Sequence, residues 1–473
     1  MRIRRIFVAN RGEIAVRIIR AAKELGIATV QAVSAADRDM LAARLADAVA
    51  PVGPAHASKS YLNKPAMLQA ALDAGCDAVH PGYGFLSENT EFAAMVEDAG
   101  LVFIGPRPET IRAMGDKAMA RAIAAKAGVR TVPGSEGRVE GVEAARRVAE
   151  EIGYPVMIKA SAGGGGRGIR VASTPAELEA LIPQASAEAQ AAFGDGGLYL
   201  ERFIARARHV EVQVLGDGER VVHLFERECS LQRRRQKVWE EAPAAALPAD
   251  IREELCASAV RLAASVGYRG AGTLEYLYDD DSREVFFIEM NTRIQVEHPV
   301  TEMITGIDLV RAMIRIAGGE PLALAQGDIR ATGHAIEVRI NAEDPSRGFL
   351  PAPGTISTLT VPGGMGVRFD TMLTQGYAVP PFYDSLLGKL VVWDDTREAA
   401  LARLTRALGE LRVEGVPTTA PLHAALAADP AVRAGAVHTR WLEAWLDAHP
   451  LAPPAPPQPA EPAVPARETL QRA

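Results

Sequence analysis

Cysteine is scarce in this 473-residue sequence. The three cysteines, Cys76, Cys229 and Cys256, lie far apart, and none belongs to a Cys-x-x-Cys pair. A disulfide framework and a structural zinc site both need several cysteines at characteristic spacings. We therefore expect three buried free thiols in a reducing compartment.

Long apolar runs and an excess of basic residues are also missing. No stretch approaches the ~18 apolar residues of a membrane-spanning helix, and the N-terminal apolar run is too short for a signal peptide. The 52 Lys and Arg residues are outnumbered by 59 Asp and Glu residues. Binding to nucleic acid needs the opposite balance. These features predict a cytoplasmic protein with neither nucleic acid nor a membrane as its partner.

The length and composition are those of a multidomain globular enzyme. With 473 residues, of which 48% are hydrophobic and 23% charged, the chain is too long for one core. Roughly two to four domains are expected.

The N-terminal region alternates short apolar strands with helices. The pattern predicts strands at 5–9, 29–33, 78–80 and 101–104, with a helix at 14–25. This order is typical of a doubly wound parallel sheet. The first turn lacks G-x-G-x-x-G, so a nicotinamide dinucleotide is not favoured. The loop at 80–89 is either a strand-end turn shaped by Pro and Gly or a functional segment.

A glycine run at 163–168 separates two predicted strands, 154–159 and 169–172. It formally matches G-x-G-x-x-G, but a dinucleotide fingerprint opens a helix. We predict instead a hairpin lid whose backbone N–H groups and Lys159 contact phosphates; a mobile surface loop is the alternative. Lys117 is either a solvated lysine or a second phosphate contact, and residues 198–204 are predicted to line a base-binding cleft.

Two further segments carry polar residues in strand-like patterns. Residues 208–214 place His209, Glu211 and Gln213 on one face, where His209 could be either structural or functional. The segment 233–237 contains four cations in five positions. We interpret it as an anion site rather than a solvated face.

The apolar run at 285–288 leads into a row of alternating polar residues. In an extended chain these side chains share one face, and such a row at the end of a sheet strand predicts a ligand site; its members are Glu289, Asn291, Arg293, Gln295 and Glu297. The acidic turn at 279–281 predicts a hairpin that brings Glu275 beside Glu289. Because magnesium prefers hard oxygen ligands, Glu275, Glu289 and Asn291 are candidate metal ligands.

The last third of the chain is rich in predicted strands. It runs from 333 to about 445, with a strand at 334–341 and a closing helix at 396–411. Arg339 alternates with Glu337 and Asn341 and could project toward the cleft. Proline and alanine dominate 452–466, which predicts a disordered tail.

Four motifs together closely resemble biotin carboxylase, an ATP-grasp enzyme. They are Ala-Asn-Arg-Gly-Glu-Ile-Ala (9–15), His-Pro-Gly-Tyr-Gly-Phe-Leu-Ser-Glu-Asn (80–89), the glycine lid and Glu-Met-Asn-Thr-Arg-Ile-Gln-Val-Glu-His (289–298). The resemblance covers 1 to about 446. It implies an α/β fold with an N-terminal doubly wound parallel-sheet (pre-ATP-grasp) domain at 1–114, an ATP-grasp domain at 115–330 with its lid at about 131–204, a strand-rich C-terminal domain at 331–446 and a Pro/Ala-rich disordered tail at 447–473.

The resemblance also implies a chemistry. Bicarbonate attacks the γ-phosphate of ATP, with Mg²⁺ or Mn²⁺ bound, and the resulting carboxyphosphate supplies CO₂ to the ureido nitrogen of biotin. Glu297 would be the base for bicarbonate and Arg293 would stabilise the ureido oxygen, with Lys237 as a third catalytic residue. Bicarbonate and biotin would be bound by Lys237, Arg293, Gln295, Val296 and Arg339, and the metals by Glu275, Glu289 and Asn291. ATP would be bound by Lys117, Lys159, Gly165, Gly166, Glu201, Arg202, Phe203, Ile204, His209, Arg235, Glu275, Leu277 and Glu289.

Two positions depart from the family pattern. Arg235 stands where His or Asn is usual before Gln-Lys, which changes the nucleotide contact expected there. Met365 stands where an aromatic residue is common in the interface of the family's homodimer.

The partners follow from what the chain does not contain. No Ala-Met-Lys-Met biotin attachment site occurs, so biotin carrier and carboxyltransferase subunits are expected on separate chains. The resemblance points to a carboxylase of the acetyl-CoA or propionyl-CoA type, as in fatty acid biosynthesis, while the final acceptor (acetyl-CoA, propionyl-CoA, urea or another acid) stays open. The alternatives are another ATP-grasp carboxylate–amine ligase and a catalytically silent nucleotide-binding partner.

Overall fold

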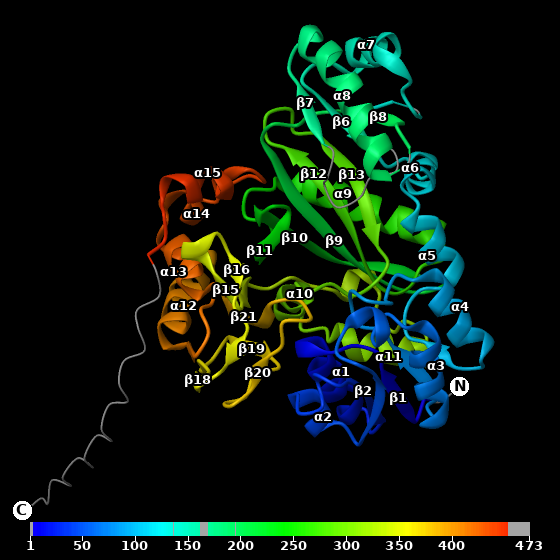
Figure 1. The fold of residues 1–473 in the computed structure, drawn as a ribbon, viewed down its shortest axis with the longest axis vertical. Helices are drawn as coiled ribbons and strands as arrows, with labels where there is room; N and C mark the ends of the chain where they lie inside the picture. The colour runs from blue at the N-terminus through cyan, green and yellow to red at the C-terminus, as the bar shows by residue number, and fades with distance from the viewer. Residues whose placement is uncertain (1–2, 136, 161–168, 194, 453–473) are drawn as a thin grey trace, which may run out of the picture.

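The computed structural model describes residues 3–135, 137–160, 169–193 and 195–452. Gly165 and Gly166, and the tail from 453 onward, lie outside these residues. Figure 1 shows three regions: a parallel sheet with its helices (blue), a green central sheet with a lid region above it, and a yellow-to-red C-terminal region beside it.

The N-terminal sheet is wholly parallel, with strand order β3-β2-β1-β4-β5. Ile6 and Val8 of β1 pack in the core that contains helix α1, whereas Phe7 packs on the opposite face with α3 and α4. Helices therefore cover both faces, and the predicted doubly wound sheet is confirmed. Its elements are β1 (Arg5–Val8), α1 (Gly12–Glu24), β2 (Ala28–Ser34), α2 (Leu41–Leu45), β3 (Ala48–Gly53), η1 (Ala57–Lys59), α3 (Lys64–Asp73), β4 (Ala78–His80), α4 (Thr90–Asp98), β5 (Val102–Phe103) and α5 (Pro108–Gly115).

The lid region is a small three-stranded sheet that stands apart from the central sheet (Figure 1). Its order is β7-β6-β8, and β6 and β7 are antiparallel. The residues between them therefore join two antiparallel strands, as the predicted hairpin requires. Its elements are α6 (Lys117–Lys126), α7 (Gly141–Ile152), β6 (Val156–Ala160), β7 (Arg170–Ala172), α8 (Pro175–Phe193) and β8 (Leu198–Arg202).

The central sheet has eight strands in the order β13-β12-β9-β10-β11-β14-β21-β19. It continues across residue 330, because β11 pairs with β14. The predicted ATP-grasp and C-terminal domains thus share one antiparallel sheet, although their boundary stays a prediction. The elements are β9 (Ala207–Asp217), β10 (Val221–Arg233), β11 (Gln236–Ala242), α9 (Ala249–Ser265), β12 (Arg269–Asp279), β13 (Val285–Asn291), α10 (His298–Thr305), α11 (Leu309–Ala317), β14 (His334–Asn341), β19 (Val367–Thr371) and β21 (Leu386–Asp394).

Helices cover the central sheet through separate hydrophobic cores. The side chains of α9 pack with β9 and β12, and those of α11 join the core of α1. Helix α12 packs on β14 and β21, with its N-terminus capped by Thr396, close to the predicted closing helix. The remaining elements are η2 (Gln326–Asp328), β15 (Glu343–Asp344), η3 (Pro345–Arg347), β16 (Leu350–Pro351), β17 (Gly354–Thr355), β18 (Thr358–Thr360), β20 (Ala378–Val379), α12 (Arg397–Glu410), β22 (Arg412–Glu414), α13 (Ala420–Ala428), α14 (Pro430–Arg433) and α15 (Trp441–Ala448).

A buried ion pair fastens α12 to the central sheet. Arg397 Nε and Nη2 donate to the two carboxylate oxygens of Glu241 at 2.6 and 2.9 Å, and His334 Nε2 lies 2.8 Å from Glu241 Oε2. Burial alone would raise the pKa of Glu241, but Arg397 and His334 lower it to about 2.

We predict that Glu241→Gln lowers the free energy of unfolding at pH 7 by about 3 kcal/mol. The native pKa lies below the unfolded value, so this stabilisation is complete above the unfolded pKa and is lost as pH falls toward 2. Urea unfolding of both proteins between pH 7 and pH 3 checks it: the difference should shrink below about pH 5. A difference that stays constant with pH would contradict the assignment.

Candidate active site

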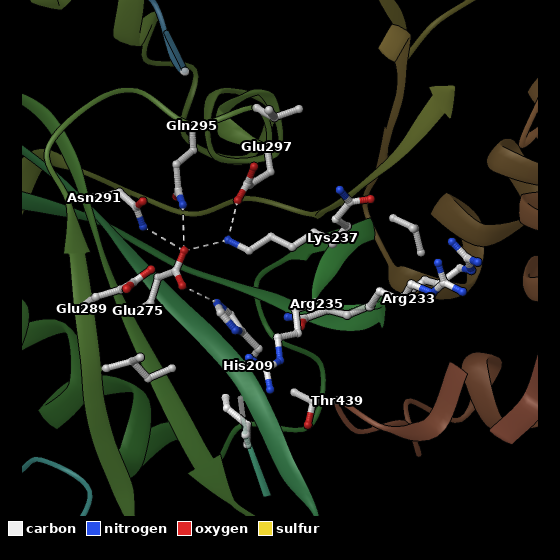
Figure 2. A pocket seen from close by; sticks show the side chains of 18 of the residues that line it. His209, Arg233, Arg235, Lys237, Glu275, Glu289, Asn291, Gln295, Glu297 and Thr439 are labelled. Atoms are coloured by element: carbon white, nitrogen blue, oxygen red, sulfur yellow. Dashed lines mark hydrogen bonds and ion pairs between the residues drawn. The ribbon is translucent and has the colours of Figure 1, made fainter. Parts of the chain in front are cut away.

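One large cleft lies between the N-terminal region, the lid region and the two halves of the central sheet. Its walls include Asn10–Glu13 and Tyr83–Phe85 from the first region, Lys159 and Glu201–Ile204 from the lid, and Arg339 from β14. Figure 2 shows side chains that line the cleft, among them His209, Lys237 and Glu275 from the central sheet. Sequence segments more than 300 residues apart therefore meet in one cavity.

The β12–β13 hairpin brings the predicted metal ligands together. Glu275 lies directly opposite Glu289 in the antiparallel register, as predicted. Asn291 Nδ2 donates to Glu275 Oε1 at 2.8 Å. Burial raises the pKa of Glu289, and the charge of Glu275 raises it further. Two neighbouring carboxylates fit a divalent cation, and the Asn291 amide oxygen beside them accepts from Arg293 Nη2 at 2.9 Å.

The predicted row of five polar residues is only partly a strand. β13 ends at Asn291, and Arg293, Gln295 and Glu297 lie in the irregular segment that leads into α10. The reason is Glu88, whose carboxylate accepts from the Thr292 backbone N at 3.0 Å and from Arg293 Nε at 2.8 Å. The turn still directs Gln295 and Glu297 toward Glu275 and Lys237, respectively (Figure 2).

Lys237 is the centre of this group. Its Nζ lies 2.5 Å from Glu211 Oε2, 2.9 Å from Glu275 Oε1 and 2.6 Å from Glu297 Oε1. Burial alone would lower the pKa of Lys237, but the three carboxylates raise it well above its usual value. One ammonium therefore offsets the negative charge of three buried carboxylates.

Glu297 is held by two cations. One oxygen contacts Lys237, and the other accepts from Arg339 Nη2 at 2.9 Å, while Arg339 Nε donates to Glu240 at 2.7 Å. Burial alone would raise the pKa of Glu297, but Lys237 and Arg339 outweigh it and lower the pKa. The Glu297 carboxylate is therefore ionised at neutral pH, and Arg339 reaches the cleft as predicted.

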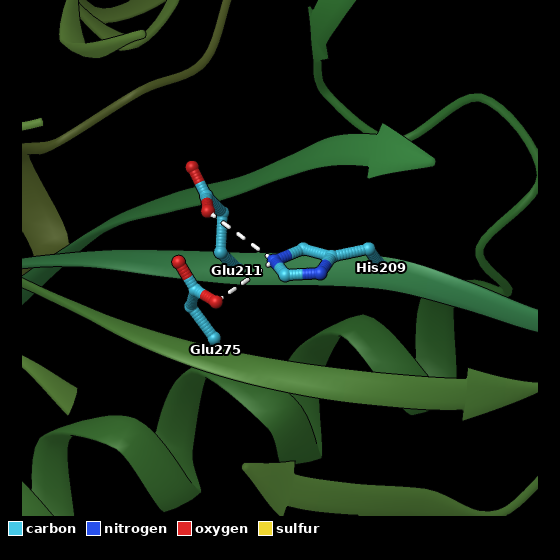
Figure 3. Close-up of side chains that lie close together, drawn as sticks. All are labelled: His209, Glu211 and Glu275. Carbon is cyan, nitrogen blue, oxygen red and sulfur yellow. Dashed lines mark ion pairs between the residues drawn. The ribbon is translucent and has the colours of Figure 1, made fainter. Parts of the chain in front are cut away.

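His209, on β9, is the last member of this group of charged side chains. Its Nε2 lies 3.2 Å from Glu275 and 3.7 Å from Glu211, as Figure 3 shows. Burial would lower the pKa of His209, but Glu275 and then Glu211 raise it to about 9. His209 is thus a charged residue that faces the cleft and not only a structural one.

The lid side of the cleft is lined by a second set of cations. Lys159 and Arg121 both pair with Glu201, and Lys117 begins α6 at the cleft wall. Arg202 pairs with Glu284 at 2.8 Å. The remaining predicted nucleotide contacts in the described residues also line the cleft: Phe203, Ile204, Arg235 and Leu277.

The four cations of 233–237 do not form one anion site. Arg233 donates to the Gly348 carbonyl and lies 4.0 Å from the centre of the Phe349 ring, while Lys237 is surrounded by carboxylates. Arg234 and Arg235 form the β10–β11 turn, with φ of +47° and +67°. The turn directs successive side chains to different surroundings, which the sequence pattern could not reveal.

Comparisons with known proteins identify the family. Residues 2–111 and 337–444 match the models "Biotin carboxylase, N-terminal domain" and "Biotin carboxylase C-terminal domain", and 116–325 match "Carbamoyl-phosphate synthase L chain, ATP binding domain". A biotin carboxylase from Nostoc is 52% identical over 94% of this chain and 99% of its own length. The chain belongs to the biotin carboxylase family.

Solved structures of the family agree. A biotin carboxylase–β,γ-ATP complex from Campylobacter jejuni has a TM-score of 0.88 and 46% identity, and the match covers 93% of this chain and 99% of that chain. The biotin carboxylase domain dimer of Hydrogenobacter thermophilus 2-oxoglutarate carboxylase, solved with MgADP, ADP and bicarbonate, has a TM-score of 0.87 and 48% identity over 94% and 98%. In the described part of this family member, no helix has the length and apolar character of a membrane span.

Two residues in this family member, one buried and one exposed, were missed by the sequence patterns. Arg227, fully buried on β10, donates to Glu211 at 2.7 Å and to Gln295 at 2.8 Å. Glu88, from the loop at 80–89, pairs with Arg293. The signal for Arg227 was the run of three charged residues, 226–228, inside the segment that forms β10. The loop at 80–89 is thus more than a strand-end turn.

We predict that Lys237→Met destabilises the protein by about 3–5 kcal/mol at neutral pH, because three buried carboxylates lose their shared cation. Their native pKa values then rise above the unfolded values, so the loss grows as pH increases from 5 to 8. Thermal unfolding of both proteins across this range measures it. Lys64→Met, which removes a surface pair with Glu91, is the control. A loss independent of pH would contradict the prediction.

Proposed function

We propose that this protein carboxylates biotin, using ATP and bicarbonate, and that biotin reaches it on a separate carrier protein. The observation that carries the proposal is the position of the ionised Glu297 between Lys237 and Arg339 at the floor of the cleft. Beside it stand the candidate metal ligands and the cationic lid wall. The family and these side chains support one reaction, which needs a base, cations for anionic substrates and a nucleotide site.

The nucleotide is assigned to the end of the cleft beneath the lid. Lys117 and Lys159 would meet the phosphates as point charges, together with the lid glycines 165 and 166. The strand end Glu201–Ile204 and Leu277 would hold the base and ribose, because Phe203, Ile204 and Leu277 offer apolar contacts at the cleft wall. His209 carries positive charge beside Glu275 and would face the phosphates.

The metal is assigned to Glu275, Glu289 and Asn291, at the β12–β13 hairpin. When bound, Mg²⁺ or Mn²⁺ offsets the negative charge of the phosphates and favours in-line phosphoryl transfer. Burial and the charge of Glu275 raise the pKa of Glu289. Because the two carboxylates repel each other, a cation bound between them would stabilise the ionised form of both.

Glu297 is assigned as the base that takes the proton of bicarbonate. Lys237 and Arg339 keep its carboxylate ionised, and the same cations would attract the bicarbonate anion. The deprotonated bicarbonate oxygen then forms a bond to the γ-phosphorus of ATP as the bond to the ADP oxygen breaks, giving carboxyphosphate. This intermediate yields CO₂ and phosphate. The released phosphate takes the ureido N–H proton, and Arg293 would stabilise negative charge on the ureido oxygen while the ureido nitrogen attacks CO₂. Gln295 and Val296 would lie beside the biotin at this end of the cleft.

The alternatives to this function are not favoured. A carboxylate–amine ligase would share the nucleotide site, but the family match extends through the C-terminal region that supplies Arg339. A silent nucleotide-binding partner would not need the ionised Glu297 between two cations. In the described residues, Arg235 is the site position at which this chain departs from the family.

The partners and location remain proposals. We infer separate carrier and carboxyltransferase chains, because the match to the Nostoc biotin carboxylase covers 99% of that protein's length, and a homodimer, as in the Hydrogenobacter relative. Met365, at the predicted interface position, is 83% exposed and thus accessible to a second copy. A cytoplasmic location and an acetyl-CoA- or propionyl-CoA-type complex complete the proposal.

Glu297→Gln should lower biotin-dependent turnover about 10²- to 10⁴-fold, because Gln cannot take a proton. Arg293→Ala should lower the same turnover while the KM for ATP changes little, since Arg293 faces the ureido group rather than the nucleotide. Bicarbonate-dependent ADP release with free biotin, with and without a carrier protein, measures both. Glu254→Gln, which removes an exposed pair with Arg261, is the control. Turnover that survives both active-site changes would exclude the assigned roles.

Arg235→Gln should raise the KM for ATP about tenfold, the cost of one charge-assisted hydrogen bond. The KM for bicarbonate should stay unchanged, because Arg235 lies at the nucleotide end of the cleft. Steady-state kinetics with each substrate varied in turn separates the two. Arg235→His, the residue usual in the family, should retain more ATP affinity than Gln. An unchanged KM for ATP in Arg235→Gln would place this side chain outside the nucleotide contacts.

A further inference from the structure

Lys389 on β21 is a fully buried lysine whose ammonium does not face the cleft. Its exposed fraction is 0%. Nζ donates to the backbone carbonyl of Val296 at 2.7 Å and pairs with Glu13 at 3.1 Å. Among the described residues that line the cleft, Lys389 does not occur. A buried charge needs compensation, so these two contacts account for where the ammonium lies.

The Val296 carbonyl belongs to the peptide between two residues of the proposed active site. Gln295 Nε2 donates to Glu275 at 2.9 Å, and Glu297 accepts from Lys237 at 2.6 Å. Both side chains therefore project into the cleft from an irregular segment that no strand ladder holds. The backbone of this segment is held instead by Lys389 and His298. His298 Nδ1 contacts the Gln295 carbonyl at 2.7 Å.

The sheet register explains why Lys389 reaches this segment. Lys389 lies directly opposite Arg339 in the antiparallel β14–β21 pair, so both side chains project from the same face. Two neighbouring side chains on one face of the C-terminal part of the sheet therefore contact the same turn. Arg339 contacts the Glu297 side chain, and Lys389 contacts the Val296 backbone.

Glu13 connects this support to the loop at 80–89. The Tyr83 hydroxyl donates to the Glu13 oxygen that also faces Lys389, and Tyr83 lines the cleft. Asn10 Nδ2 donates to the carbonyls of Pro81 and Tyr83, both at 2.7 Å. Gly82 has φ of +62°, and a Cβ there would come within 3.0 Å of Asn10 Nδ2. The motif at 9–15 therefore fixes the loop at 80–89 by direct contact.

We propose that Lys389 and Glu13 form a buried positioning pair, which sets the direction in which the Gln295 and Glu297 side chains enter the cleft. The pair also couples this direction to the position of the loop that contains Tyr83. This role rests on the proposed function of Glu297. Neither residue touches a substrate in this proposal; both act through the backbone of Val296 and the hydroxyl of Tyr83. Replacing a buried ion pair by uncharged residues is often neutral for stability, so a loss of activity without a loss of stability separates positioning from simple structural support.

The test uses the full chain with three variants. Lys389→Met leaves Glu13 uncompensated, whereas Glu13→Gln/Lys389→Met removes both charges and keeps a partner for the Tyr83 hydroxyl. Arg252→Met is the matched control, since it breaks the pair with the fully buried Glu226, away from the 293–298 segment. In the double variant, biotin-dependent turnover should fall about 10- to 100-fold, the cost of misplacing a catalytic group by about 1 Å. Its KM for ATP should stay within about twofold, and its midpoint of thermal unfolding near that of the wild type.

Amide hydrogen exchange of the peptide covering 293–298 is the second readout. Exchange should be faster in both Lys389 variants and unchanged in Arg252→Met. A double variant with wild-type exchange and turnover would overturn the positioning role. Wild-type protein that carboxylates no biotin would instead refute the proposed function, and the exchange comparison would still decide whether Lys389 and Glu13 hold this turn.

Discussion

The ammonium of Lys237 among three buried carboxylates is the interaction on which the rest of the site depends. Glu211, Glu275 and Glu297 come from β9, β12 and the turn before α10. Without a shared cation, their mutual repulsion in a low-dielectric interior would separate these elements or protonate the carboxyl groups. The same cation keeps Glu297 ionised. One electrostatic contact therefore both closes the floor of the cleft and ionises the carboxylate that we propose as the base.

The second constraint is the continuity of the central sheet. Because β11 pairs with β14, the C-terminal strands extend the sheet that holds the candidate metal ligands. Arg339 and Lys389 then approach the turn at 292–297 from a direction that the β12–β13 hairpin cannot supply. The Glu297 carboxylate consequently has its partners on separate strands, which hold it beside the cleft although its own segment is irregular.

Much of the fold and site could be predicted because the signals are local. Period-two alternation gave the β12–β13 hairpin and the facing of Glu275 and Glu289, and the strand–helix order gave the parallel sheet. Alternation failed past Asn291, where Glu88 binds the backbone of Thr292 and turns the chain. The run of cations at 233–237 did not reveal that its members have different partners, because two residues with positive φ form a turn within it.

The sequence by itself determined the family, the parallel N-terminal sheet and the types of residue that the site needs, since these follow from short motifs and from the periodicity of single segments. Only the tertiary structure decided that Arg227, Glu211 and Lys389 support that site. Each is a charged residue within a strand, and its partners lie on other strands or in distant loops. Such pairings depend on sheet register and on contacts between remote segments, and neither is written in any local pattern.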